Sequence, residues 1–332
     1  MELRASFSSR KGFLYDMLSY HLGWTDQQGQ PEDNPPPAHF PSLIALVTCQ
    51  ALSGDFRKSL PIAAAVEFVY NFTLVHGEVQ SGGIDAQERP SIWWVWGPAQ
   101  AINAGDGLHA LGRSTMMRLA EWGLEPDAVL QAVKALDQAC LSLCEGQYMD
   151  LSFQDQLLVT EADYLDMVRR KAGSLPGCSA HLGALASGAE PDVCAQFQEL
   201  GVKLGMAWQL TRDISSLWGP EGDGSTASNV LNRKKSLPII YAFDHSDIPT
   251  KRELGNIYMK RVLEQDDTVR IINILEQCDA RQYAEAQAQQ LAEEALATLG
   301  ELCLPEDGLT SFETLGRWAL GKSNPSENPS GW

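Results

Sequence analysis

Hydrophobic positions recur with helical spacing over most of the chain, and the alternation typical of strands is scarce. The two segments at 41–52 and 59–77 are apolar nearly all round, which predicts buried helices. The segment at 126–153 is amphipathic over its whole length and predicts one long helix. Similar patterns follow at 98–122, 161–187 and 191–219, with Gly and Pro marking the turns between them. The pattern therefore predicts an all-α protein.

The two ends of the chain differ from this helical body. Residues 26–41 are polar and rich in proline, which lacks the backbone N–H and clashes with the preceding helical turn. They separate a short N-terminal helix, expected at about 8–22, from the main body. We expect three parts: an N-terminal helix and Pro-rich arm at 1–35, a helical domain at 36–320, and a disordered tail at 321–332.

Composition and charge limit the kinds of molecule that this chain is expected to bind. The net charge is −18, which repels nucleic acid and anionic lipid over most of the surface. No uncharged apolar run of about 18 residues is present, and the start lacks a secretory pattern. The seven cysteines are scattered without a CxxC pair, which indicates reduced thiols and argues against disulfides or structural zinc. We expect a cytoplasmic protein without a membrane span and without nucleic-acid binding.

Six stretches resemble, in order, the motifs of the trans-prenyl diphosphate synthases, the family of polyprenyl and geranylgeranyl diphosphate synthases. The strongest single anchors are the segment from Asn103 to Asp106 and the Lys171–Gly173 pair. The six stretches are AAAVEFVYNFTLVH (63–76), ERPSIWWVWGPAQAINAGD (88–106), CEGQYMDL (144–151), YLDMVRRKAGSL (164–175), GMAWQLTRDISSLWG (205–219) and RKKSLPI (233–239). The resemblance implies the class I isoprenoid synthase fold, a large antiparallel helical bundle around a central cavity, and a dimer.

The reaction that the resemblance implies has three requirements. An allylic diphosphate ionises, and the double bond of isopentenyl diphosphate attacks the resulting cation. Carboxylates must hold Mg²⁺ against the leaving diphosphate, and Lys and Arg side chains must hold both diphosphates. An apolar cavity must keep water from the carbocation.

The first aspartate-rich motif of the family, DDxxD, is largely missing here. Its three aspartate positions fall on Gly77, Glu78 and Ser81, and the arginine pair that follows falls on Ala86 and Gln87. Two carboxylates on consecutive turns of one helix face form the usual Mg²⁺ clamp. With Ser81 in the second place, only Glu78 could bind a metal.

The second motif and the homoallylic site are also depleted. Arg212, Asp213 and Ser216 stand at the second DDxxD, so one carboxylate remains and an arginine reverses the local charge. The family's GKRxRP segment falls on residues 36–41, which contain neither lysine nor arginine. The standard ligand sets for Mg²⁺ are therefore incomplete, so Mg²⁺ stays open as a cofactor and no other cofactor is predicted. Glu78 and Asp213 are weak candidates both for metal binding and for catalysis.

Other residues do match the family. The resemblance makes four side chains candidates for diphosphate binding: Lys171, Arg212, Lys234 and Lys235. It makes five side chains candidates for lining the cavity: Phe72, His76, Gln147, Trp208 and Gln209. Simpler interpretations remain open, namely solvated lysines and polar helix–helix contacts for the glutamines and Asp150. The Trp93–Trp96 cluster is better explained by core or interface packing than by a cavity wall.

Two functional hypotheses compete. The favoured one is a non-catalytic or regulatory subunit of a heteromeric prenyl diphosphate synthase. The expected assembly is a homodimer or a heterodimer with an intact prenyl diphosphate synthase, and a prenyl diphosphate is the expected ligand. Cys140 and Cys144 resemble the CxxxC of plant small subunits, although two small core residues would explain the spacing too. The alternative is a divergent terpene synthase or unusual prenyltransferase that holds one prenyl diphosphate in a basic, metal-poor site. A protein that only binds a prenyl ligand is the third class.

Overall fold

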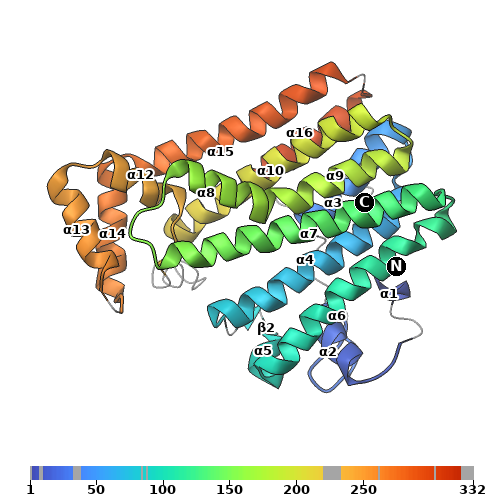
Figure 1. Cartoon of the computed structure of the whole chain (residues 1–332), viewed down its shortest axis with the longest axis horizontal. Coiled ribbons are helices and arrows are strands. Elements are labelled where there is room, and N and C mark those ends of the chain that lie inside the picture. Colours follow the sequence, from blue (N-terminus) through green and yellow to red (C-terminus); the bar gives the residue numbers. More distant parts are fainter. Residues whose placement is uncertain are drawn as a thin grey trace. The chain divides into compact units, whose positions relative to one another are not determined.

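The fold is almost entirely helical, which confirms the prediction of an all-α protein (Figure 1). The structure, a computed structural model, describes residues 2–6, 10–32, 39–83, 85–86, 89–219, 233–260, 262–302 and 304–322. Within these ranges the only sheet is the two-residue pair β1 (Asp85–Ala86) and β2 (Arg89–Pro90). No helix in the described part of the chain is both long and apolar enough to cross a bilayer.

The chain divides into two compact units, and the first comprises residues 1–138 and 178–198. Its helices are α1 (Glu2–Ala5), α2 (Phe13–His21), α3 (Phe40–Ser53), η1 (Phe56–Ser59), α4 (Leu60–Ser81), α5 (Ile92–Trp96), α6 (Pro98–Met116) and η2 (Met117–Trp122). The beginning of α7 (Pro126–Gln154), most of α9 (Ser174–Ser187) and the beginning of α10 (Pro191–Trp218) belong to it as well. Helices α4 and α6 lie side by side (Figure 1).

The second unit comprises residues 139–177 and 199–332. It contains the remaining parts of α7, α9 and α10 together with α8 (Glu161–Val168), η3 (Arg169–Gly173), α12 (Leu237–His245), α13 (Ile248–Tyr258), α14 (Gln265–Gln277), α15 (Ala280–Ala297), η4 (Thr298–Glu301) and α16 (Glu306–Ala319). One core joins α8, α10, α12 and α15, where Ala284 and Ala288 let α15 approach closely. A second core lies between α12, α13 and α14.

The helix boundaries follow the sequence pattern, with one difference at the N-terminus. Helix α2 begins at Phe13 and not at about 8, because Gly12 has a φ of 120°, which no helix contains. The segment at 36–38 and the tail at 323–332 lie outside the described residues. The extents proposed for the helical domain and its two flanking parts stay a prediction.

A buried polar network fastens α2 and the start of α3 to α4. The carboxylate of Glu67 accepts hydrogen bonds from His39 Nδ1 (2.5 Å), Ser42 Oγ (2.6 Å) and Asn71 Nδ2 (3.1 Å). His21 Nε2 in turn donates to Asn71 Oδ1 (2.9 Å). Burial lowers the pKa of His21 to about 4, so this ring is neutral. Every member of the network has a partner, as buried polar groups require.

Candidate functional site

Asp213 on α10 is the centre of a buried hydrogen-bond cluster in the second unit. Its Oδ2 accepts from Tyr164 Oη (2.8 Å), and its Oδ1 accepts from Gln209 Nε2 (2.8 Å) and Lys234 Nζ (3.0 Å). Asp213 is only 2% exposed. Burial, followed by the neighbouring Asp213 charge, raises the pKa of Tyr164 well above its ordinary value, so this phenol stays a donor. Asp213, the one carboxylate predicted at the second motif, is therefore already bound by three side chains.

A second ion pair lies beside this cluster. Lys171 Nζ forms a close ion pair with Asp150 Oδ2, and both side chains are largely buried. Burial opposes ionisation of Asp150, but the charges of Lys171 and Lys234 outweigh it and hold the pKa of this carboxyl below its usual value. The same two aspartates outweigh burial at Lys234 and raise its pKa. Two buried lysines are thus neutralised by two buried aspartates.

Close backbone contacts between helices place Lys171 toward Asp150. The helix opens into a π-turn at η3, a feature common at functional sites. A Cβ on Gly146 of α7 would lie 2.3 Å from the backbone nitrogen of Lys171, and one on Gly205 of α10 would lie 2.5 Å from the carbonyl oxygen of Ala172. Glycine at these positions is what lets α7 and α10 approach the π-turn.

The other two predicted cations do not join the ion-pair cluster. Lys235 is buried, with its Nζ 4.2 Å from the ring centre of Tyr258 and 3.4 Å from the carbonyl oxygen of Arg233. Burial, and then the nearby Arg233 charge, lowers the pKa of Lys235 to about 8. Arg212 is exposed, and its guanidinium lies 5.0 Å from the ring centre of Trp208. Of the four side chains predicted to bind diphosphate, Lys171 and Lys234 therefore lie in the ion-pair cluster. Arg212 and Lys235 lie outside it.

The first-motif residues lie in the first unit, on α4 and α6. Phe72 contacts His76 (ring centres 5.0 Å apart) and His109 (5.2 Å). His76 Nε2 donates to the carbonyl oxygen of Ile102 (3.2 Å). A Cβ on Gly105 would lie 2.2 Å from the His76 ring, so this glycine of the Asn103–Asp106 motif makes room for the imidazole.

Two site residues were missed by the sequence interpretation. His109 follows Asp106 by three residues on α6, so it lies on the same helix face, and that spacing could have drawn attention to it. Tyr164 opens a stretch that was matched for its lysine, and no local signal indicated that its hydroxyl binds Asp213. Gln147, predicted for the cavity, is partly buried on α7.

Glu78 stands alone at the first motif. Its Oε2 is buried and has no hydrogen-bond partner among the residues described. Burial raises the pKa of Glu78 to about 8, so the side chain is largely a neutral acid at neutral pH. A bound Mg²⁺ needs several charged oxygens, yet no group of three or more His, Cys, Asp or Glu suited to a metal occurs in the described ranges. The donor sets at both motifs do not fit a magnesium cluster.

Glu78→Gln should remove a pH dependence of stability. Because the folded pKa of about 8 lies above the ordinary 4.5, the folded state binds the extra proton between these values. Wild-type stability should therefore fall as pH rises through this window, whereas the neutral amide should not respond. Melting temperatures measured over the window for both proteins test this, and parallel curves would contradict it.

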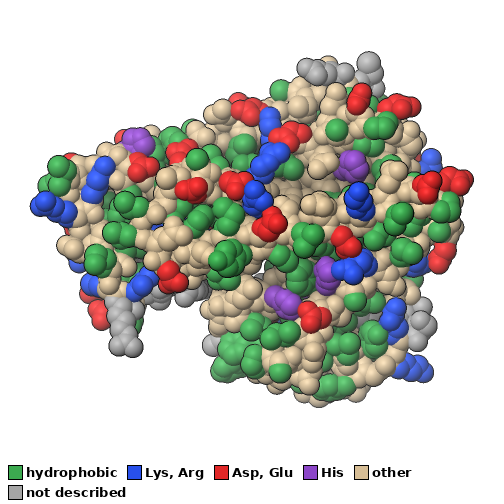
Figure 2. Space-filling model, in the orientation of Figure 1, with side chains coloured by type: hydrophobic (Ala, Val, Ile, Leu, Met, Phe, Trp, Pro, Cys, Tyr) green, Lys and Arg blue, Asp and Glu red, His purple; other side chains and the backbone are tan. Residues whose placement is uncertain are grey.

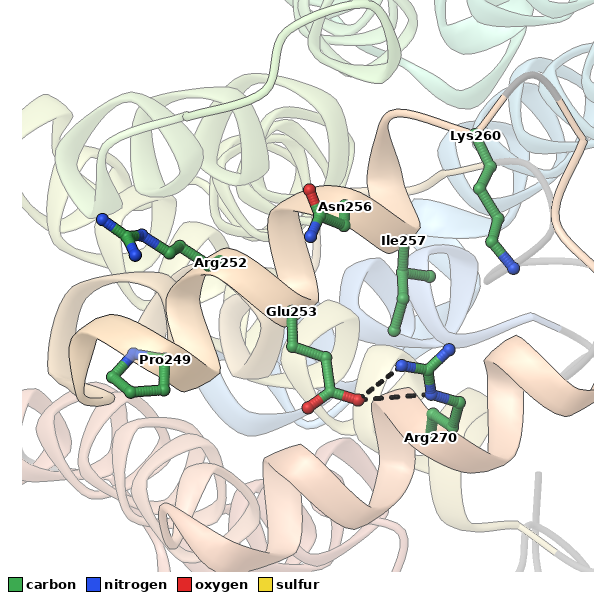
Figure 3. Close-up of a pocket in the computed structure, with 7 residues that line it drawn as sticks. All are labelled: Pro249, Arg252, Glu253, Asn256, Ile257, Lys260 and Arg270. Carbon is green, nitrogen blue, oxygen red and sulfur yellow. Dashed lines mark hydrogen bonds and ion pairs between the residues drawn. The ribbon is translucent and has the colours of Figure 1, made fainter.

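A separate hollow of about 360 Å³ lies between α13 and α14 (Figure 3). Two of its cations are in ion pairs: Arg270 donates to Glu253 (2.7 Å), and Lys260 donates to Asp267 (2.6 Å). Figure 3 shows Glu253 and Arg270 pointing toward each other, while Arg252 points away from them. The Arg270–Glu253 pair joins α13 and α14 at this hollow.

Comparisons with known proteins agree on the family. The sequence model of the polyprenyl synthetase family matches residues 39–275. Geranylgeranyl diphosphate synthase of Mycobacterium tuberculosis is 32% identical over 300 residues, 90% of this chain and 84% of that protein. Geranylfarnesyl diphosphate synthase of Aeropyrum pernix is 33% identical over 257 residues, 76% of this chain and 80% of that protein. The crystal structure of a polyprenyl synthetase from Streptomyces coelicolor A3(2) superimposes with a TM-score of 0.86 at 28% identity, covering 96% of this chain and 95% of the other.

Proposed function

This chain belongs to the polyprenyl synthetase family, and we propose that it acts in isoprenoid metabolism as a non-catalytic or regulatory subunit of a prenyl diphosphate synthase. In this proposal it associates with an intact synthase and changes that enzyme's activity or product length. It does not itself elongate prenyl chains.

The occupation of Asp213 carries the proposal. Three donors, Tyr164, Gln209 and Lys234, already bind its two oxygens, and the position before it is the cation Arg212. A Mg²⁺ ion would have to displace the Lys234 ammonium and then sit beside a guanidinium. At such short separations, repulsion between like charges in a buried site amounts to several kcal/mol. Chain elongation that depends on magnesium is therefore disfavoured at this motif.

The first motif supports the same conclusion independently. A largely protonated Glu78 offers little charge to a divalent ion, and the turn that should supply the second carboxylate carries Ser81. The absence of lysine and arginine from residues 36–41 removes charge-assisted hydrogen bonds of about 1.5–3 kcal/mol each from the homoallylic diphosphate.

A direct test is co-expression of this chain with an intact prenyl diphosphate synthase of the same organism. We expect native mass spectrometry to detect a stable mixed dimer, and the partner's product length or rate to change. The variant Arg212→Ala should form the same mixed dimer as wild type, because the subunit role does not require this side chain. A self-associated dimer that ignores the partner would overturn the proposal.

Magnesium binding provides a second prediction. The isolated chain should have the same melting temperature in Mg²⁺ with inorganic pyrophosphate as in NaCl of equal ionic strength. The reason is that a ligand stabilises only a protein that binds it. Differential scanning fluorimetry measures this. An intact synthase serves as the positive control, and a Mg²⁺-dependent rise in this chain would contradict the proposed loss of the metal sites.

One observation favours a second candidate, a divergent enzyme that acts on one prenyl diphosphate. The exposed guanidinium of Arg212 packs on Trp208, and its charge acts against the rise in the pKa of Lys234, so two cations lie near each other. Such a pair could hold a diphosphate bidentately without metal. Prenyl diphosphates supplied singly, with and without Mg²⁺, to wild type and Arg212→Ala would identify this activity.

A further inference from the structure

Helix α2 lies against α4 and α6 as a short, separate element of the first unit (Figure 1). It has nine residues, and an isolated helix of that length is marginal in water. Gly12 before it and Gly23 after it have φ angles of 120° and 70°, so the chain leaves the helical conformation at both ends. Helix α2 therefore depends on the surface on which it docks.

Apolar side chains supply much of this docking. Met17, Leu18 and Tyr20 of α2 are at most 2% exposed, and they belong to one core cluster with Phe68 of α4 and Leu108 of α6. Hydrophobic side chains also gather on the surface at the end of the view where α2 and α5 lie (Figure 2). Undocking of α2 would expose this cluster to water, which favours the docked state.

His21 is a polar side chain in the docked face of α2, and it is only 5% exposed. Its Nε2 donates to Asn71 Oδ1 (2.9 Å), and Asn71 Nδ2 donates to Glu67 Oε1 (3.1 Å). The Glu67 carboxylate thus reaches the ring through an amide. The imidazole docks as a neutral donor, and a charged ring at this place would lose its hydration.

The charged groups around His21 come from three other elements. Burial has the largest effect on the pKa of His21, and the charges of His39 at the N-cap of α3 and Arg89 on β2 lower it further. The hydrogen bond from Asn71 and the charge of Glu67 on α4 act in the opposite direction. Helix α6 contributes apolar side chains to the cluster under α2. A proton on the ring is therefore disfavoured while α2 is docked.

We propose that α2 is an acid-sensitive strap, whose docking on α4 weakens when the His21 ring takes up a proton. The docked pKa of about 4 lies below the ordinary 6.5, so the undocked state binds the proton more tightly. Docking should be fully stable above pH 6.5 and should weaken progressively as the pH falls toward 4. This device goes beyond the proposed subunit function, and either could hold without the other.

Hydrogen exchange followed by mass spectrometry tests the strap in the full chain. After correction for the intrinsic pH dependence of exchange, α2 should open about thirtyfold more often at pH 5 than at pH 7.5, because its pKa differs between the docked and undocked states. His21→Gln keeps an amide donor for Asn71 but cannot ionise, so its α2 should open equally often at both pH values. The matched control is His245→Gln, which changes an exposed histidine of α12 and should behave like wild type.

Three results would overturn the proposal. The first is wild-type α2 whose corrected opening is the same at both pH values. The second is a His21→Gln protein that responds to pH as wild type does, which would assign the response to another group. The third is an equal loss of protection in α10, which would indicate global unfolding by acid. If His21→Gln does not fold, an NMR titration of the wild-type rings decides: His21 should titrate near pH 4, and titration near 6.5 would contradict the proposal.

Discussion

Gly146→Ala should destabilise the protein by about 3 kcal/mol or more, because the new methyl group overlaps backbone atoms that cannot rotate away. The added Cβ would lie 2.3 Å from the nitrogen and 2.8 Å from the Cα of Lys171. Relief would require α7 and the π-turn η3 to separate, which would also pull Lys171 from Asp150. Urea unfolding followed by circular dichroism measures the loss.

Gly255→Ala is the matched control for Gly146→Ala. Gly255 is also a glycine within a helix of the second unit, yet nothing lies within 4 Å of its added Cβ. Alanine should therefore stabilise α13 there by about 0.5–1 kcal/mol. Equal effects of the two substitutions would show that helix propensity, and not the close approach of η3, decides what residue 146 does.

Asp213→Ala should lower the free energy of unfolding by about 3–5 kcal/mol, which is the loss typical of removing one partner from a buried charge network. It would leave the Lys234 ammonium buried without its counterion, and Tyr164 and Gln209 without their acceptor. We expect the midpoint of urea unfolding to fall accordingly. If Asp213 instead served mainly to bind a metal, its removal from the metal-free protein would relieve carboxylate desolvation and change stability little.

Asp166→Ala supplies the comparison for Asp213→Ala. Asp166 also pairs with a cation, Arg170, but both side chains are exposed to solvent (47% and 40%). Exposed ion pairs contribute about 0–1 kcal/mol to stability, so this substitution should change the free energy of unfolding little. A large loss at Asp166 and a small one at Asp213 would contradict the assignment of the buried cluster.

The expected results for Gly146→Ala and Asp213→Ala both bear on function, because both substitutions disturb the buried cluster of lysines and aspartates. In a metal-dependent synthase, lysines and aspartates near the motif must be available to diphosphate and Mg²⁺. Here Lys171 and Lys234 are bound to Asp150 and Asp213, and the cluster is electrically balanced without ligand. A large stability loss at Asp213, together with no response to Mg²⁺, would support a structural role for Asp213 and its partners.

The sequence by itself determined the fold class and the family. Helical periodicity is a local property, so the boundaries of α3, α4 and α7 could be predicted within a few residues. Motifs such as the segment from Asn103 to Asp106 are read directly from residue order, and so is the presence of Ser81 and Arg212 where the resemblance predicts aspartates. Which residue stands at a given position is known without a structure.

Only the tertiary structure decided which side chains meet. Lys171, Lys234 and Lys235 looked alike in sequence, yet two lie against aspartates and Lys235 lies against Tyr258. Tyr164 is 49 residues from Asp213, and such pairing depends on how helices pack and not on spacing along the chain. Burial, too, is a property of packing, and it is burial that raises the pKa of Glu78.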